Sequence, residues 1–459
     1  MDIQDNKNLI FVIILAIILI FSFTFTSEIS LYFLLLLLLV VLIILFSFYP
    51  ILGVYLMVFL YPFNYFEFIY GQINVPYVDL VGLVLFISWG LKKIYWHFIG
   101  KEKLSIADFP MWFLMFLFVL SAALSLINIE RELLLTGLKY ILRPLIFFYL
   151  IYVILPFNII DNAKKLFQVL KIMFVLGLGL SLMGLWSLAF PPIEGLRRVV
   201  PISILGIYPL GTNHNLYAEV LVCLIPLALI LFWQEKKDLF WKNIYLFGAL
   251  IMTGVNLLTL SRAGWLTIAL QIVILAILKY RGEIKKLLVN YLFYLGLAII
   301  TPILYLMYRL LTSYVVVSSN LNRLKLIEIA FDMLADHPFI GNGVGTFITV
   351  VSQVQWYIIE YGGALDAHGF VFKTLAEVGV LGTIAFILLL VYPVYLLIKG
   401  YQKSLNHNYN WVVLGMLLAV IGVISFQLFG TGYYIAKLWL PIGLGLATLK
   451  IYKLEFIKK

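Results

Sequence analysis

Apolar stretches separated by short polar segments recur along almost the whole chain. Most of them approach the roughly 20 residues that a helix needs to cross a bilayer. We expect only helices, because lipid cannot satisfy backbone polar groups and no alternating strand pattern is present. Fourteen spans are predicted, at Leu9 to Phe25, Ser30 to Phe48, Ile51 to Phe68, Val78 to Leu91, Phe109 to Ile127, Leu138 to Leu155, Leu166 to Phe190, Leu216 to Trp233, Ile244 to Leu260, Trp265 to Tyr280, Leu287 to Leu310, Phe370 to Ile398, Trp411 to Leu428 and Tyr434 to Leu449.

Two runs are weak, since Pro62 and Asn64 interrupt the third and the fourth has only 14 residues, so 12 or 13 spans also fit the pattern. Composition supports the membrane class: 64% of the 459 residues are apolar or aromatic and 12% are charged, against about 45–50% and about 25% in soluble proteins. The predicted fold is an all-α polytopic membrane protein with about 12–14 transmembrane helices, in a single membrane domain over residues 1–459. The lone cysteine, Cys223, excludes a disulfide scaffold and a thiolate metal cluster.

The positions of the lysines predict the orientation in the membrane. Lysine clusters follow every second span, as expected for cytoplasmic loops. Both termini are therefore predicted to be cytoplasmic, in the cytoplasmic (inner) membrane. The two longest polar stretches, 191–215 and 311–367, then form outward-facing loops. This topology accounts for the net charge of +10, so membrane lipid is an expected partner and nucleic acid is not.

The arginines are distributed differently from the lysines. Only four of the 24 lysines fall on the predicted outer half. Seven of the eight arginines do: Arg131, Arg143, Arg197, Arg198, Arg262, Arg309 and Arg323. A planar guanidinium binds phosphate through two parallel hydrogen bonds, so this bias indicates a phosphate or diphosphate ligand on the outer side. Alternatively, insertion rules exclude lysine from this side and the arginines are merely residual.

The second outer loop contains a helix signal, with capping residue types at 318–320 and a helical run that ends before Pro338. Wound at about 100 degrees per residue, the run is amphipathic. One arc carries Leu321, Leu324, Ile327, Ala330, Phe331 and Leu334, and the opposite arc carries Lys325, Glu328, Asp332 and Asp336. Arg323 falls on the apolar arc, where it needs an anionic partner, unless it snorkels to the rim.

The helix is followed by a glycine run, Gly341–Gly345, in the same loop. Its backbone amides form either a tight turn or an anion-binding nest. It is not a nucleotide fingerprint, because no strand precedes it and it lies on the outer side.

His368 ends the loop, directly before the apolar run from Phe370. A near-neutral imidazole there can accept a proton from a hydroxyl nucleophile, although a lone loop histidine is also commonly structural. Glu377 would lie about 13 Å deeper and on the opposite face, so we do not expect it to pair with His368. Its predicted partner is Lys373, and Glu377 serves either helix packing or substrate binding.

Other candidate substrate-binding residues lie at the ends of predicted spans. Arg262 occupies a tight corner between two spans, and Arg197 and Arg198 lie in the first outer loop. His214 and Asn215 lie at the start of the span that follows that loop. Adjacent loop arginines are commonly only solvated, which is the alternative for this pair.

Arg143 lies beside Pro144 in the outer half of its span, and it joins the same site if helix packing brings it there. His214, His337 and His368 lack the local spacing of a zinc site. We therefore expect no metal and no cofactor.

Four of these segments resemble pieces of the O-antigen ligase and O-antigen polymerase superfamily of bacterial envelope proteins, in the same order. They are "GTNHNLYAEVLVCLIPL" from Gly211, "SRAG" from Ser261, "RLKLIEIAFDMLADHPFIGNGVGTF" from Arg323 and "HGFVFKTLAEVGVLG" from His368. The last is similar to the family signature of His, Asn or Ser, then Leu, Glu and two glycines, with Gly369 at the Asn or Ser position. The likeness covers about residues 197–383.

The resemblance implies a metal-independent glycosyltransferase of polysaccharide or lipopolysaccharide biosynthesis. It implies an undecaprenyl-diphosphate-linked glycan as donor and a hydroxyl of a lipid, glycan or protein as acceptor, on the outer side of the cytoplasmic membrane. By the same resemblance, Arg262 and Arg323 bind the donor diphosphate, and His368 orients or deprotonates the acceptor. The chemistry of these residues agrees, because diphosphate departure needs charge neutralisation and the hydroxyl needs a positioned base.

Three activities remain open at this stage. A ligase would transfer a finished chain to a foreign acceptor, and a polymerase would add another repeat unit to a lipid-linked chain; the compact Arg-helix and His-Gly loop favours the ligase. A transporter of lipid-linked glycan is less favoured, because its charges should lie at the midplane and its halves should repeat.

Overall fold

The computed structural model describes residues 28–70, 73–100, 105, 108–192, 198–279, 314–430 and 436–454. The predicted spans Leu9 to Phe25 and Leu287 to Leu310, together with Arg197 and Arg309, lie outside these residues. The described elements are α2 Glu28–Phe48, α3 Pro50–Leu60, β1 Glu67–Tyr70, β2 Ile73–Pro76, α4 Tyr77–Phe98, α5 Trp112–Ser125, η2 Leu126–Asn128, η3 Arg131–Leu133, α6 Leu134–Tyr140, η4 Ile141–Phe147, η5 Tyr149–Ile154, α7 Leu155–Ile159, α8 Ala163–Ala189, α9 His214–Gln234, α10 Leu239–Leu258, α11 Arg262–Lys279, α14 Tyr314–Asp336, α15 Phe347–Gln353, α16 Gln355–Tyr361, α17 Phe370–Ser404, α18 Asn410–Gln427 and α19 Ala436–Ile451.

Six of the described helices are long and apolar enough to cross a membrane: Arg131–Ile159, Ala163–Ala189, His214–Gln234, Arg262–Lys279, Phe370–Ser404 and Asn410–Gln427. A seventh is added if the pair Leu37–Phe48 and Pro50–Leu60, bent by 116°, is one span. Helices α4, α5, α10 and α19 lie where the sequence predicts further spans. The all-α polytopic membrane fold is confirmed, and the total of 12–14 spans stays a prediction because the structure describes only part of the chain.

The third predicted span is shorter than expected. Helix α3 ends at Leu60 instead of continuing to Phe68, because Pro62 has no amide hydrogen and restricts the residue before it. The Asn64 side chain then donates to the Tyr61 carbonyl at 3.2 Å, which satisfies one of the free carbonyls at the helix end. A two-stranded antiparallel hairpin, β1 and β2, follows in place of the last helical turns.

The helical body is built around α9 and α18, which are the most enclosed of the six spans, whereas α11 is the least enclosed. Polar and small side chains hold these helices close together. From α11, Gln271 Nε2 donates to the Val222 carbonyl of α9 at 2.8 Å and to the Leu418 carbonyl of α18 at 2.9 Å. On α19, a Cβ at Gly443 would lie 2.1 Å from the Tyr152 carbonyl oxygen of η5, so only glycine permits this approach.

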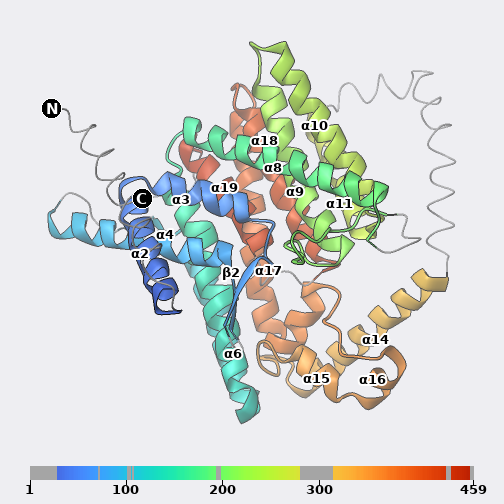
Figure 1. The fold of residues 1–459 in the computed structure, drawn as a ribbon. Helices are drawn as coiled ribbons and strands as arrows, with labels where there is room; N and C mark the ends of the chain where they lie inside the picture. The colour runs from blue at the N-terminus through green and yellow to red at the C-terminus, as the bar shows by residue number, and fades with distance from the viewer. Residues whose placement is uncertain are drawn as a thin grey trace, which may run out of the picture.

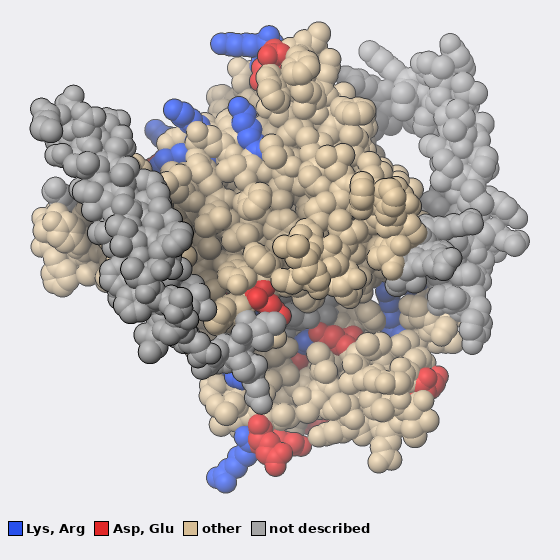
Figure 2. All heavy atoms as spheres, viewed as in Figure 1, with Lys and Arg blue, Asp and Glu red and all other residues tan. Residues whose placement is uncertain are grey.

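Helices α14, α15 and α16 form a separate layer at one end of the body, and α17 runs from this layer into the body (Figure 1). The layer has its own apolar cluster, centred on Leu326, Ile329, Met333, Phe347, Val351 and Tyr357. On the face shown in Figure 2, uncharged side chains cover most of the body, and a band of charged side chains lies next to the layer.

The buried face of α14 differs from the predicted apolar arc. Its buried residues are Leu326, Ile329, Ala330 and Met333. Leu321, Leu324 and Phe331 belong to the predicted apolar arc, which was expected to face the membrane or the protein, and they are 54%, 60% and 50% exposed. The helix is apolar over more than one face, so composition alone could not show which face packs on the protein. Arg323 is one turn before Leu326 and lies on the buried side, as expected.

The glycine run packs into a break in α17. Gly379 has φ 66° and ψ −171°, which interrupts the helix inside the apolar segment. The amide of Val380 donates to the Pro338 carbonyl at 2.9 Å, and the amide of Gly343 donates to the Glu377 carbonyl at 2.9 Å. These bonds replace those that the break removes from the helix. The glycine run is therefore the tight turn of the two alternatives, because its amides bond within the fold.

Candidate functional site

The predicted catalytic residues gather around the contact between α11 and α14, near the start of α17. Helices α9, α11 and α17 all begin at this end with a predicted site residue in or just before the first turn: His214, Arg262 and His368. Arg323 comes from α14 of the layer. The site thus combines segments that are more than 150 residues apart in the chain.

The corner between α10 and α11 fixes the position of Arg262. Leu260 has φ 56°, a left-handed conformation that makes the sharp turn. The buried Ser261 hydroxyl accepts from the Gly264 amide at 3.3 Å, which is N-cap geometry for α11. The same hydroxyl donates to Asn215 Oδ1 at 2.7 Å. Asn215 therefore ties the start of α9 to the corner that carries Arg262.

Arg262 also connects the body to the layer. Its Nη1 atom donates to Asn320 Oδ1 of α14 at 2.7 Å. Asn320 precedes Arg323 by three residues, so the two side chains lie on one side of the helix. The sequence indicated Asn320 only as a helix-capping type, and its spacing from Arg323 was the signal for a role in the site.

Arg198 and Arg323 each have a buried Nε atom without a hydrogen-bond partner in the part of the chain that the structure describes. Arg198 is placed beside the corner, because the next amide, of Val199, donates to the Leu258 carbonyl at 2.9 Å. Burial, and then the charge of Arg262, lower the pKa of Arg323. A buried guanidinium without a counter-charge raises the free energy of the fold, unless an anion binds to it.

His368 lies within the field of the same arginines. Burial and the charges of Arg323 and Arg262 lower the pKa of His368 to about 4, while Asp366 acts in the opposite direction. The imidazole is therefore neutral at pH 7 in the ligand-free protein, and a ring nitrogen can accept a proton.

His214 lies at the start of α9, where Arg198 and Arg262 both act on it electrostatically. The structure thus brings together five of the predicted residues around the corner: Arg198, His214, Asn215, Arg262 and Arg323. Arg197 lies outside the described residues.

Residues 247–387 match the family model of O-antigen ligases. The match includes α11, α14 to α16 and the first half of α17, and hence Arg262, Arg323 and His368. This region of the chain is similar to the O-antigen ligase family. The family indicates an enzyme of the glycosyltransferase type that acts on lipid-linked glycans. No curated protein matches the chain.

The O-antigen ligase match agrees with three of the four segments on which the sequence resemblance rests, those that begin at Ser261, Arg323 and His368. The fourth, from Gly211, precedes the matched residues, although the structure places its Asn215 against Ser261 at 2.7 Å. The candidate site therefore includes a residue outside the matched region.

A buried ion-pair network lies beneath His368. Lys373 Nζ contacts Asp366 Oδ2 at 2.9 Å and Glu377 Oε1 at 3.9 Å, so the predicted pairing of Lys373 with Glu377 is present. The Glu377 side chain is 1% exposed, and its Oε1 atom accepts from the Phe347 amide at 3.1 Å. Glu377 thus holds the start of α15 against α17.

Arg143 has a different environment from the arginines of the corner. Its Nε and Nη2 atoms donate to Asp79 Oδ2 of α4 at 3.1 and 2.7 Å, and Tyr152 donates to the other carboxylate oxygen. No hydrogen bond or ion pair joins Arg143 to Arg262 or Arg323 within the described ranges. Asp79 could not be predicted as its partner, because the two residues are 64 positions apart in the chain.

The described residues include no group of three His, Cys, Asp or Glu side chains that could hold a metal ion together. His214 and His368 lie at the starts of different helices, α9 and α17. Metal independence remains a prediction.

Proposed function

We propose that this protein transfers a glycan from an undecaprenyl-diphosphate carrier to an acceptor hydroxyl on the outer face of the cytoplasmic membrane. The observation that carries the proposal is the cluster of Arg198, Arg262 and Arg323 beside a neutral His368, with no ion pair to any of the three arginines among the described residues. Below, "arginine cluster" means these three residues.

The arginine cluster has the properties of a diphosphate site. Two phosphoryl groups carry about two negative charges and several acceptor oxygens, which suit two or three forked guanidinium groups. The unsatisfied Nε atoms of Arg198 and Arg323 provide donors that no described protein atom uses. Asn320 holds Nη1 of Arg262 and leaves its other N–H groups for the ligand.

In the reaction, the bond between the anomeric carbon and the diphosphate oxygen breaks, and the acceptor oxygen bonds to that carbon. The leaving undecaprenyl diphosphate gains negative charge, which the arginine cluster stabilises. A ring nitrogen of His368 takes the proton of the acceptor hydroxyl. The guanidinium groups supply the charge that a divalent metal supplies in other transferases, so we propose a metal-independent reaction.

Donor binding prepares His368 for its role. In the ligand-free protein burial, and then the charges of Arg323 and Arg262, lower the pKa of His368 to about 4, which makes it a weak base. A bound diphosphate neutralises Arg262 and Arg323, so their part of the shift is lost and the pKa of His368 rises. His368 is then a stronger base when the donor is present.

The remaining predicted residues divide into two roles. Asn215 and His214 lie at the corner with Arg262, and we propose that they line the donor site. Glu377 is buried against the Phe347 amide, so we propose that it positions the loop before His368 and does not contact substrate. Arg143 is paired with Asp79, and its side chain is 44% exposed. The substrate-binding role predicted from the sequence requires a ligand to contact this exposed part.

A ligase that uses a lipid acceptor and a polymerase that extends the lipid-linked chain share this chemistry, and we propose the ligase. The outward orientation of residues 191–215 and 311–367 rests on the lysine clusters, as do the cytoplasmic termini. The amphipathic α14 with its exposed Leu321 and Leu324 supports a layer at the membrane surface.

The test is glycan transfer by the purified full chain from a synthetic undecaprenyl-diphosphate-linked glycan, in EDTA, with lipid A-core and unmodified donor as competing acceptors. Replacement of Arg323 by Lys or His368 by Gln should lower the rate by about 10²-fold or more. The matched control is Lys325→Gln, an exposed residue of the same helix. Unchanged transfer by both site variants would contradict the proposal, and transfer to the donor itself would identify a polymerase.

A further inference from the structure

A cavity of about 440 Å³ lies at the end of the body opposite the arginine cluster. This end is defined by the start of α8, the end of α9 and the start of α10, whereas α9 and α11 begin at the arginine cluster. The volume is within the roughly 300–1,000 Å³ of ligand sites. The lining residues are Lys171, Phe174, Val175, Leu178, Glu235, Trp241, Ile244 and Tyr245.

The cavity combines an apolar wall with two opposite charges. Lys171 and Leu178 are seven residues apart on α8, so the wall extends about 10 Å from the lysine. Val175 and Trp241 are 65% and 48% exposed, so the cavity opens on the side of the bundle, where lipid surrounds a membrane protein. A tryptophan and a tyrosine beside it are typical of the level of the lipid headgroups.

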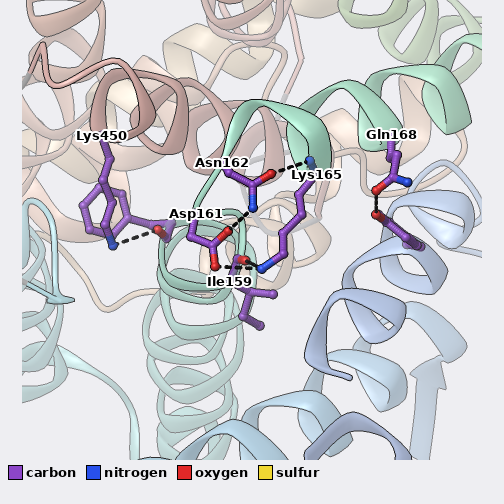
Figure 3. Close-up of polar contacts among 8 residues, drawn as sticks. Ile159, Asp161, Asn162, Lys165, Gln168 and Lys450 are labelled. Atoms are coloured by element: carbon purple, nitrogen blue, oxygen red, sulfur yellow. Dashed lines mark hydrogen bonds and ion pairs between the residues drawn. The ribbon is translucent and has the colours of Figure 1, made fainter. Parts of the chain in front are cut away.

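Lys171 is a cation without a partner. It is exposed, and it makes no hydrogen bond or ion pair with the described residues. Two other lysines at this end are engaged, as Figure 3 shows: Lys165 contacts Asp161 at 2.7 Å, and Lys450 donates to the Phe157 carbonyl at 3.2 Å. Lys171 thus retains its donors for a ligand.

Glu235 is held in place for a ligand. Its Oε1 atom accepts from the amides of Lys237 at 3.1 Å and Asp238 at 3.2 Å, in the turn between α9 and α10. No ion pair to Glu235 is found in the described part of the chain, and Lys171 lies on the same cavity. The cavity therefore offers one fixed anion and one free cation next to an apolar wall.

We propose that the α8–α10 cavity binds one zwitterionic phospholipid with a primary ammonium headgroup, such as phosphatidylethanolamine. Lys171 contacts the phosphate, Glu235 accepts from the ammonium, and an acyl chain follows Phe174, Val175 and Leu178. An anionic lipid fits less well, because Glu235 repels it and is not neutralised by it. This site is separate from the arginine cluster and does not depend on the proposed transfer reaction.

The first test uses the unmodified purified chain and native mass spectrometry, with phosphatidylethanolamine, phosphatidylcholine and phosphatidylglycerol of matched chains in competition. We expect one bound phosphatidylethanolamine, preferred by roughly tenfold, because its ammonium donates hydrogen bonds to Glu235 that a quaternary ammonium cannot. Equal or stronger retention of phosphatidylglycerol would overturn the proposal and identify an anionic-lipid site.

Two variants locate the bound lipid. Lys171→Gln should release it, and Glu235→Gln should remove the preference for phosphatidylethanolamine over phosphatidylcholine while lipid still binds. The control is Lys164→Gln, an exposed lysine on the same helix that does not line the cavity. If Lys164→Gln and Lys171→Gln lose lipid equally, the binding is a general effect of positive charge and the assigned site is wrong.

Discussion

Two sets of cations lie within the protein, and they differ in whether a carboxylate accompanies them. The paired set consists of Lys373 with Asp366, Lys437 with Glu219 and Arg143 with Asp79, at 2.9, 3.4 and 2.7 Å. The arginine cluster has no ion pair among the described residues, and two of its Nε atoms are buried without a partner. The paired cations lie on η4, α17 and α19, whereas the arginine cluster lies on α11, α14 and the segment before α9.

The difference indicates which charges serve the fold and which serve a ligand. A buried ion pair links helices, and removal of one partner leaves a charge that lipid or protein cannot solvate. A group of cations without counter-charge adds no ion pair to the ligand-free fold, and its mutual repulsion is relieved by an anion. Variants of the two sets should therefore have opposite consequences for stability and activity.

The largest expected effect is on stability, at the most deeply buried pair. Lys437, which is 0% exposed, contacts Glu219 and also donates to the Leu216 carbonyl at 3.2 Å. Lys437→Met leaves the Glu219 carboxylate unpaired, and we expect a loss of about 3–5 kcal/mol in the free energy of unfolding. Thermal unfolding in detergent measures it. The double variant with Glu219→Gln should recover much of the loss; no recovery would mean that the charge pair is not the cause.

The next effect concerns the link between Arg262 and the layer. Asn320→Ala removes the acceptor at 2.7 Å from Nη1, so we expect kcat/KM to fall by about tenfold or more, with stability unchanged. Asn320→Asp should lower kcat/KM further than Asn320→Ala does, because the new carboxylate pairs with Arg262 and competes with the donor diphosphate. Donor-saturation curves for both variants measure this. An Asp variant as active as the unmodified protein would exclude Arg262 from the diphosphate site.

A smaller effect is expected in the pH dependence. The positive charge of Arg323 helps to lower the pKa of His368 to about 4, so Arg323→Gln should raise that pKa. His368 must be neutral to accept a proton, so the acidic limb of the kcat/KM profile should move to higher pH in the variant. Lys325→Gln, on the exposed face of α14, should leave the profile in place. Identical profiles for all three proteins would show that Arg323 does not act on His368.

The smallest expected effect is on the stability of the ligand-free protein when the arginine cluster is altered. Arg323→Gln removes a cation that has no ion-pair partner among the described residues, so the melting temperature should stay the same or rise slightly. This result contrasts with the large loss expected for Lys437→Met. A marked fall in the melting temperature of Arg323→Gln would show that Arg323 stabilises the fold as the paired cations do.

The apolar pattern predicted the fold class and most helices, because lipid imposes both length and composition on a span. It also placed Arg323 on the buried side of α14 and paired Lys373 with Glu377, since both follow from helical spacing. The hairpin after α3 and the break at Gly379 were not predicted. The break depends on bonds to the segment 338–343, which local periodicity does not encode. The hairpin pairs neighbouring residues, and the apolar pattern placed the start of its first strand in a span.

The candidate site shows the same limit. The sequence indicated Arg262, Arg323 and His368 individually, and the structure shows that their charges interact. The sequence could not show that Asp79 accepts hydrogen bonds from Arg143, or that the Ser261 hydroxyl donates to Asn215. These contacts join residues 64 and 46 positions apart. It also could not show which apolar face of α14 packs, since several faces of that helix are apolar.

The central claim is that the arginine cluster binds the diphosphate of the donor, and it can be measured without turnover. The measurement is the affinity of the purified full chain for undecaprenyl diphosphate, by thermal stabilisation over a concentration series in EDTA, for the unmodified protein, Arg323→Gln and the surface control Lys325→Gln. The account predicts saturable stabilisation of the unmodified protein and the control, and an affinity about tenfold or more lower for Arg323→Gln. Equal affinity for all three proteins would contradict it.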